Sequence, residues 1–496
     1  MKKILSILLI VVLVFSLSAC GAKSNETNTN EGADAKENDK VSNEKVKLSL
    51  VMKDEIPSDP IVIKYFEAIE QGLAEEGINV DIELIEMPAG NYAEKLNLML
   101  LGGTVPDIIY FQGGDQQVSQ QGLLEDLTPY IEKSKYIKES LETHNIKRLE
   151  NYPYLLWIKP INSKIPVVRG DWFSKLETSN ALLENPSIDN YFNLFKELKE
   201  KDFSGNGNPT YGVTVAGNIS ELDQIFDQAF GNTSTWVKDE NGKYIYNRVS
   251  NGEKEKLAFY NKLYEEGILD SEYLTKKWDT KEQAFYDNQV GVIIGTAGKV
   301  IDIYDGKMKK ANGEESGLIA LPPAKGKGQG YLPVDVSKET RGIAISALSE
   351  HKEEAFKVLE FLASPKGQKL DRLGFENEHY EVKENKAVLT EKSQEWYARF
   401  WEPTNFNIDI ELATPLLGYP AAESLKLANQ YYTEDINFLI PEEYTAKWDA
   451  MENLYKEYSA DIITGKRQLD EFDKFVEEWY KAGGKEISKY ANETLK

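Results

Sequence analysis

Five oxygen-bearing side chains stand at alternate positions of the segment 202–210: Asp202, Ser204, Asn206, Asn208 and Thr210. With Asp202 as position 1, Gly207 takes position 6, and this alternation around a turn glycine is typical of the start of an EF-hand calcium loop. Asp202 is the one carboxylate of the five, and Val213 at position 12 cannot close a calcium site. Two interpretations stand: a weak structural calcium site, or a Gly/Asn/Ser turn between a helix and a strand.

Cys20 is the single cysteine of the 496-residue chain and ends the run Leu17-Ser18-Ala19-Cys20. Lysines at positions 2 and 3 precede an apolar stretch over 7–15. This pattern predicts a signal peptide over residues 1–19, too short for a membrane-spanning helix. The cleavage site resembles the lipobox of bacterial lipoproteins, in which the cysteine becomes the lipidated first residue. An ordinary signal peptide with an incidental cysteine is the alternative.

Eight tryptophans offer flat aromatic faces, of the kind that pack against sugar rings beside fixed polar groups. Trp448 and Trp479 follow helical patterns and are expected in the core. Four others stand in loop-like contexts or at element ends and are candidates for a ligand cleft: Trp172, Trp236, Trp278 and Trp401. Trp157 precedes Lys159-Pro160, near the expected first crossing between lobes. For each of these tryptophans, core packing is the alternative.

Arg169 begins the tripeptide Arg169-Gly170-Asp171, which integrins read in other proteins. Valines before it and Trp172-Phe173 after it indicate a strand entering a helix, so we take the integrin match as chance. Arg169 either contacts a ligand in a cleft or pairs with a neighbouring acid.

Enzyme and metal motifs are mostly absent. The chain has no HExxH, GxSxG, GxxxxGK[ST] or GxGxxG motif, and its three histidines are widely spaced. We therefore expect no catalytic residue, no transition-metal site and no required cofactor. A surface-anchored polysaccharide hydrolase or lyase is nevertheless an alternative function, because such an enzyme needs only two carboxylates at the right separation.

The formal net charge of −24 argues against nucleic acid as a partner through bulk charge. The length and the 41% hydrophobic content predict two or more large cores. A lone cysteine forms no internal disulfide, so packing must hold the fold. Residues 21–45 are polar or small, with Val41 as the only bulky apolar side chain, which predicts that 20–45 form the lipidated cysteine and a flexible tether.

Strand and helix patterns alternate from residue 46 onward. Strands are expected at 47–52, 80–84 and 107–111, with helices at 61–73 and 92–100 between them. This β-α-β-α-β order predicts a parallel or mixed sheet with helices on its faces. Ligands bind beyond the carboxyl ends of such strands, here near Tyr110 and Asp115.

Later segments repeat the α/β pattern: strands at 291–295, 318–321 and 341–346, and helices at 355–362 and 469–480. The chain therefore reads as a large α/β protein of two lobes, with more than one crossing between them.

Several segments, in this order along the chain, carry a resemblance to a known family: 92–107, 122–127, 169–172, 202–208, 341–365 and 374–380. They are similar to extracellular solute-binding proteins of sugar ABC transporters, in particular to the long lipidated subgroup that resembles alginate-oligosaccharide-binding proteins. The similarity runs from about residue 46 to the C-terminus and includes the lipobox.

The resemblance implies a type II periplasmic-binding-protein-like α/β fold, with a ligand cleft between two lobes and several crossing segments. We expect lobe 1 at 46–160 plus 325–375, and lobe 2 at 161–324 plus 376–496. The implied function is capture of a saccharide for an ABC import permease by a monomer lipid-anchored on the outer face of a Gram-positive membrane. A ligand sensor that partners a membrane signalling protein is a further alternative.

Overall fold

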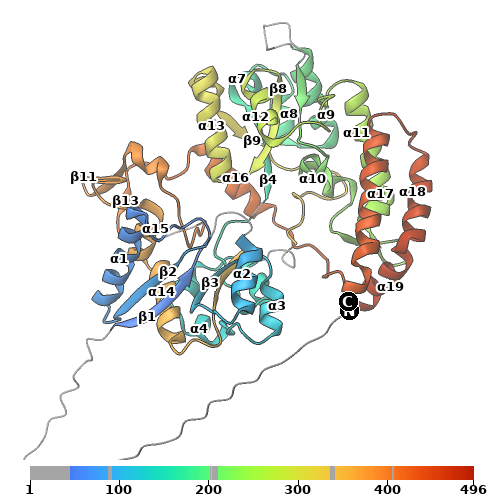
Figure 1. Ribbon diagram of the computed structural model, residues 1–496. Coiled ribbons are helices and arrows are strands. Elements are labelled where there is room, and N and C mark those ends of the chain that lie inside the picture. Colours follow the sequence, from blue (N-terminus) through green and yellow to red (C-terminus); the bar gives the residue numbers. More distant parts are fainter. Residues whose placement is uncertain are drawn as a thin grey trace, which may run out of the picture. The chain divides into compact units, whose positions relative to one another are not determined.

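The computed structural model of the chain describes residues 45–87, 92–161, 163–201, 203, 210–335, 341–404 and 407–495 (Figure 1). These residues form a mixed α/β protein with two four-stranded sheets and two smaller ones. The sequence prediction of an α/β fold is confirmed.

The sheet of the first lobe has the order β10-β3-β1-β2. Its strands are β1 (Val46–Val51), β2 (Val80–Ile85), β3 (Ile108–Gln112) and β10 (Arg341–Ile345). β1 pairs in parallel with β2 and β3, whereas β10 runs antiparallel to β3. The helices α1 (Pro60–Glu75) and α2 (Tyr92–Leu101) connect the parallel strands, as the alternation of patterns predicted. The remaining first-lobe helices before the first crossing are α3 (Asp115–Gln120), α4 (Thr128–Lys133), α5 (Tyr136–Ser140) and α6 (Thr143–Asn151).

Helices from two distant parts of the sequence cover this sheet. α14 (Lys352–Ala363) and α15 (Pro365–Leu373) lie beside α1 (Figure 1), and the three helices share one hydrophobic core. Close packing needs Gly72 in α1, since a Cβ there would lie 2.2 Å from Cζ of Phe361. Phe400 and Trp401, fully buried, belong to this core although we expected residues beyond 375 in lobe 2. Burial of two large aromatic rings holds the segment here.

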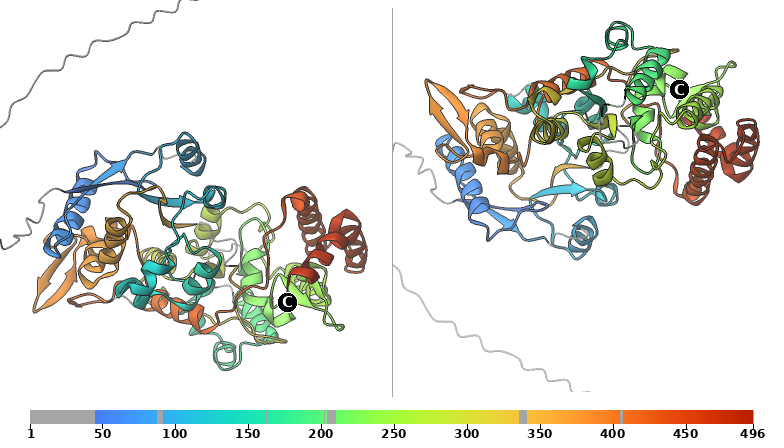
Figure 2. Two further views of the ribbon diagram at one scale, coloured as in Figure 1. Left: turned by 90° about the horizontal axis from the view of Figure 1, so that it is seen from below. Right: turned by 90° about the horizontal axis from the view of Figure 1, so that it is seen from above.

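A small sheet of order β11-β12-β13 follows α15 and is drawn in orange in Figure 2. It consists of β11 (Tyr380–Lys383), β12 (Lys386–Leu389) and β13 (Glu411–Leu412). Leu373 at the end of α15 packs into its core with Tyr380 and Ala387.

The sheet of the second lobe has the order β5-β8-β4-β9. Its strands are β4 (Lys164–Arg169), β5 (Tyr211–Val213), β8 (Val290–Thr296) and β9 (Leu318–Ala320), with β4 antiparallel to both of its neighbours. Helices around it are α7 (Gly170–Phe173), α8 (Ser179–Glu184), α9 (Ile188–Glu200), α10 (Ser220–Phe226), α11 (Asn251–Glu265), α12 (Trp278–Tyr286), α13 (Lys299–Asn312) and α16 (Tyr419–Gln430). β6 (Trp236–Lys238) and β7 (Tyr244–Tyr246) form a separate hairpin.

Three C-terminal helices extend the second lobe: α17 (Thr445–Ile463), α18 (Glu471–Trp479) and α19 (Lys485–Thr494). α17 packs along α11, with the red and green helices adjacent in Figure 1. Trp479 is fully buried and stacks on Tyr246, with ring centroids 5.5 Å apart. The prediction of Trp479 as a core residue is confirmed.

Among the described residues, the chain passes between the lobes three times, around 158–163, 332–341 and 413–418. The first elements after these passages are β4 in the second sheet, β10 in the first sheet and α16 against the second sheet. Residues 325–335 had been expected in lobe 1. Tyr331 instead lies in a second-lobe core, where its hydroxyl donates to the Leu321 carbonyl at 2.7 Å. Within the described ranges, no helix combines the length and the apolar character needed to cross a membrane.

A charged cluster lies fully buried in the second lobe between α10 and α11. The Lys256 ammonium is 2.8 Å from Asp223 and 3.0 Å from Glu253, and it also bonds Asp227. Arg248 pairs with Asp223 at 3.0 Å. The three carboxylates thus share Lys256 away from water, and Arg248, whose side chain is 17% exposed, joins them at the edge of the cluster. Burial and the neighbouring Asp223 carboxylate raise the pKa of Asp227 to about 7.

We predict that Asp227→Asn removes a pH-dependent loss of stability. A folded-state pKa raised to about 7 means that the proton stabilises the fold below pH 4 and that this stabilisation is lost as pH rises to 7. Between these limits the free energy of unfolding of the variant, relative to the wild type, should rise by about 1.4 kcal/mol per pH unit. Urea denaturation from pH 4 to 8 measures this difference. The exposed Asp473→Asn is the control, and equal pH slopes for Asp227→Asn and wild type would contradict the prediction.

Candidate functional site

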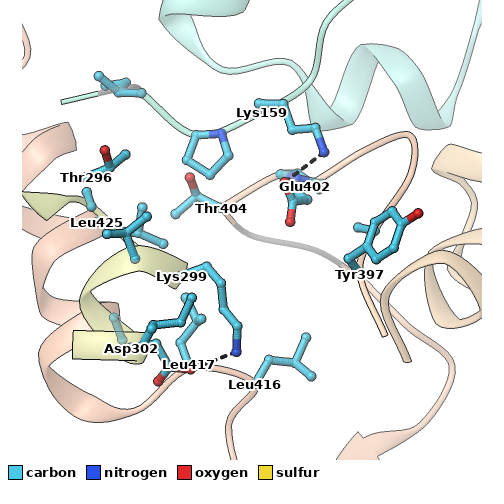
Figure 3. A pocket seen from close by; sticks show the side chains of 18 of the residues that line it. Lys159, Thr296, Lys299, Asp302, Tyr397, Glu402, Thr404, Leu416, Leu417 and Leu425 are labelled. Atoms are coloured by element: carbon cyan, nitrogen blue, oxygen red, sulfur yellow. Dashed lines mark hydrogen bonds and ion pairs between the residues drawn. The ribbon is translucent and has the colours of Figure 1, made fainter. Parts of the chain in front are cut away.

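A cavity of about 2080 Å³ opens between the two lobes, lined by residues of both lobes and of all three crossings (Figure 3). Pockets for small molecules commonly measure about 300–1,000 Å³. The cavity, called the cleft below, therefore has room for a ligand of several linked rings.

Aromatic rings form one wall of the cleft on the first lobe. Tyr110, in the middle of β3, and Trp157, at the first crossing, have ring centroids 5.8 Å apart and are half-buried. The Lys159 ammonium lies 5.2 Å from the Trp157 ring centroid, and the Arg341 guanidinium lies 5.8 Å from it. Trp396 and Tyr397 also line the cleft. Flat rings beside cations can hold a sugar ring and its polar substituents.

Helix α6 fixes this wall through its buried polar side chains. Asn145 Nδ2 donates to the Trp157 carbonyl at 3.0 Å, and His144 Nε2 bonds the Lys159 carbonyl at 2.8 Å. Arg148 donates to the Leu155 carbonyl at 2.7 Å and also to the Arg341 carbonyl. Burial lowers the pKa of His144, so the neutral ring donates from Nε2 at pH 7. The first crossing and the start of β10 are thus held together.

The described cleft lining carries more cations than anions, unlike the chain as a whole. Nine cationic side chains line it: Arg148, Lys159, Lys299, Lys307, Lys309, Lys310, Arg341, Arg372 and Lys426. Five carboxylates accompany them: Asp302, Asp305, Asp335, Glu391 and Glu402. The whole sequence has 58 Lys and Arg against 82 Asp and Glu, so the excess of positive charge is local to the cleft.

Two ion pairs face each other across the cleft in Figure 3. Lys159 bonds Glu402 at 2.7 Å, between the first crossing and the segment that follows Trp401, and Lys299 bonds Asp302 at 3.0 Å on α13. Burial opposes ionisation of Glu402, but the charge of Lys159 outweighs it and lowers the pKa of Glu402. These pairs keep charged groups oriented at the ligand surface of both lobes.

Of the predicted ligand residues, the structure places Tyr110 on the cleft. Asp115 at the start of α3 was expected beside it, but this carboxylate is fully buried and accepts the Tyr154 hydroxyl at 3.1 Å. Asp115 does not line the cleft because its side chain points into the first lobe. Burial raises its pKa.

Arg169 and Trp172 are buried in the second lobe, away from the cleft. Arg169 pairs with Asp171 at 2.7 Å and lies over the Trp172 ring at 4.2 Å, so the acid-pairing interpretation holds for the described contacts. Trp172 stacks on Phe203 at 5.1 Å. Strand β4 turns into α7 here, which places both side chains in the core.

Trp236, Trp278 and Trp401 also lie off the cleft. Trp236 is fully buried and stacks on Phe438 at 5.3 Å, and Trp401 is fully buried with its ring nitrogen donating to the Leu359 carbonyl at 3.1 Å. Trp278 is 61% exposed on α12, outside the cleft lining. Distant parts of the chain cover the loop-like segments of Trp236 and Trp401, which local patterns do not reveal.

Among the cleft residues that were missed as candidates are Trp157, Arg341, Trp396 and Tyr397. Each lies at a crossing, or in the segment before one. The position of Trp157 beside Lys159-Pro160 was the signal that could have selected it.

Cys20 lies outside the described residues, as do Asp202, Ser204, Asn206 and Asn208. Thr210 is described and is buried just before β5. Elsewhere in the described chain, no group of three or more His, Cys, Asp or Glu side chains is arranged to hold a metal ion.

The sequence profile described as bacterial extracellular solute-binding protein matches residues 59–369, more than half of the chain. Lipoprotein LipO of Bacillus subtilis is 24% identical over 83% of this chain and 86% of its own length. The polygalacturonan/rhamnogalacturonan-binding protein YtcQ of the same organism is 22% identical over 98% of each chain.

A solved structure supports the same architecture. The alginate-binding protein AlgQ2, in a structure without calcium ion, matches with a TM-score of 0.56 and 17% identity over 92% of this chain and 99% of its own. At this identity the match concerns the fold, which is that of two-lobed solute-binding proteins. The expected fold class is therefore confirmed.

We predict that core and cleft tryptophans differ in their effect on stability. Trp236→Ala should lower the free energy of unfolding by about 3–5 kcal/mol, because it leaves a cavity among fully buried rings. Trp157→Ala should cost clearly less, since its ring is half-buried and faces the cleft. Urea denaturation of both variants checks this. Equal losses would place Trp157 in the core.

Proposed function

The chain belongs to the family of bacterial extracellular solute-binding proteins, and we propose that it captures an oligosaccharide and presents it to an ABC import permease. The cleft carries this proposal. Its volume of about 2080 Å³ suits several linked sugar rings, and its aromatic wall stands beside many polar side chains. Stacking on aromatic faces and hydrogen bonds to hydroxyls are the two interactions that sugars offer.

The charge of the cleft favours a saccharide that carries carboxylates. Nine cations against five anions line it in a chain with a net charge of −24. Such a local excess attracts anions and supports binding of an acidic ligand. YtcQ and AlgQ2, whose names state polygalacturonan, rhamnogalacturonan and alginate as ligands, support this class.

Ligand-driven approach of the two lobes is the proposed working motion. The three crossings connect the lobes and also line the cleft, so a ligand there touches the segments that would bend. Only the difference between its affinities for the closed and open states can drive closure. We assign residues 45–161 and 341–412 to the first lobe, and 163–335 and 413–495 to the second.

The anchor and the calcium loop remain proposals from the sequence. A lipid on Cys20 followed by the 20–45 tether would hold a monomeric binder at the outer face of the membrane, near its permease. The name of LipO supports a lipoprotein. For 202–210 we propose a weak calcium site of structural role, because oxygen donors alternate around Gly207.

Calorimetric titration of the secreted chain with a saccharide panel tests the function. The panel holds tri- and tetragalacturonate, alginate trisaccharide, a rhamnogalacturonan tetrasaccharide, kestose and nystose. We expect an acidic member to bind most tightly, more weakly at 500 mM than at 50 mM NaCl. Trp157→Ala should weaken binding about tenfold, as loss of a stacking face costs on the order of 1 kcal/mol. Lack of binding at millimolar saccharide, or release of shortened products, would contradict the proposal.

Cys20→Ala tests the anchor separately. The variant should appear in the culture medium as an intact protein with wild-type saccharide affinity, while uptake by the cells falls. Membrane fractionation and a radiolabelled uptake assay measure the two effects. Ser18→Ala, which keeps the cysteine, is the control. Unchanged uptake with Cys20→Ala would show that import does not depend on tethering.

A further inference from the structure

A second, smaller pocket of about 310 Å³ adjoins the cleft in the first lobe. Its walls are residues 54–62, which run from the loop after β1 into the first turn of α1, and the segment 378–399. Trp396 and Tyr397 line both this side pocket and the cleft, so they form the partition between them. A substituent of a ligand held in the cleft would pass Tyr397, which is 52% exposed, to reach the side pocket.

Glu55 lines the side pocket, and one of its carboxylate oxygens has no hydrogen-bond partner among the described residues. Its carboxylate is 3% exposed, and Oε1 accepts the Tyr397 hydroxyl at 2.8 Å and lies 3.0 Å from Arg399 Nε. Oε2 is buried and has no hydrogen-bond partner among the described residues. A buried charged oxygen without a donor is costly, so such an atom needs an explanation. A hydrogen-bond donor on a bound ligand would explain it.

The backbone beside Glu55 is strained. Asp54 has φ 64°, a left-handed conformation that a residue other than glycine adopts at a cost. Strain of this kind persists where the surroundings hold it, and it collects at ligand sites. Here it turns the chain between β1 and α1, and it precedes the residue that carries the unpaired oxygen.

The charge of the side pocket is opposite to that of the cleft. Five carboxylates line it against two cations, Lys392 and Arg399. A carboxylated sugar would be repelled there, whereas a neutral sugar offers hydroxyl donors and an apolar ring face. The two compartments therefore favour groups of different charge.

We propose that the side pocket is a subsite for one neutral sugar residue of the oligosaccharide held in the cleft, with a hydroxyl that donates to Glu55 Oε2 and a ring that packs on Tyr397. This subsite rests on the proposed saccharide function. It makes the protein specific for an oligosaccharide that combines acidic residues with at least one neutral residue.

Two variants of the secreted chain test the subsite by different routes. Ile61→Trp fills the side pocket, because Ile61 lines it from α1, and Glu55→Gln replaces the free acceptor oxygen by an amide donor. The control is Glu75→Gln, an exposed position at the other end of α1. Thermal unfolding shows which variants fold. If Ile61→Trp does not fold, Glu55→Gln, the smaller change, still tests the subsite.

Each variant is titrated with the six saccharides of the panel. We expect the rhamnogalacturonan tetrasaccharide, which alternates acidic and neutral residues, to bind the wild type most tightly. Ile61→Trp should weaken its binding at least tenfold and Glu55→Gln about fivefold, with Glu75→Gln unchanged. Two outcomes overturn the subsite alone, provided that the wild type binds some panel member. In one, both pocket variants bind within twofold of the wild type; in the other, trigalacturonate is the tightest ligand. Absence of binding by the wild type overturns the proposed function and the subsite together.

Discussion

The carboxylate of Asp371 is the contact on which both compartments depend. It is fully buried at α15 and accepts four donors: the Tyr65 hydroxyl at 2.6 Å, and the backbone N–H groups of Arg399 at 2.9 Å and of Phe400 and Trp401 at 3.1 Å. Hydrogen bonds to a buried charge are strong, and each donor left without it would be costly. One side chain thus ties α1, α15 and the segment before the third crossing together.

That tie explains why residues far along the sequence form part of the first lobe's ligand surface. Trp396 and Tyr397 stand just before the anchored residues, and Glu402 stands just after them on the cleft. The buried Trp401 ring holds the same segment by packing. Because both sides of the segment are fixed, Tyr397 can present its ring to the cleft and its hydroxyl to Glu55. Polar anchoring and apolar burial therefore act on the same few residues and orient their neighbours.

The sequence predicted the regular elements well and the ligand residues poorly, for one physical reason. Apolar spacing reports which face of a local element is buried, so β1, α1 and α18 were found near their observed bounds. Whether a loop tryptophan is covered depends on residues that are distant in sequence. Trp236 is covered by Phe438, and Trp401 reaches Leu359. Neither partner is marked by spacing or composition.

The crossing segments indicate the ligand residues better than the number of tryptophans does. The segments that join two lobes lie at the base of the cleft between them. Polar and aromatic residues in these segments are therefore ligand candidates whatever their local pattern. Trp157 and Lys159 at the first crossing, and Arg341 at the second, meet this condition. Arg169 does not meet it, because this residue ends a strand inside one lobe and forms an ion pair with Asp171. The same logic sets the limit of sequence reading. Crossings can be located only after elements have been assigned to sheets, and residues 396–401 are held on the first lobe by the buried Asp371 carboxylate together with burial of Phe400 and Trp401, contacts that local spacing does not mark.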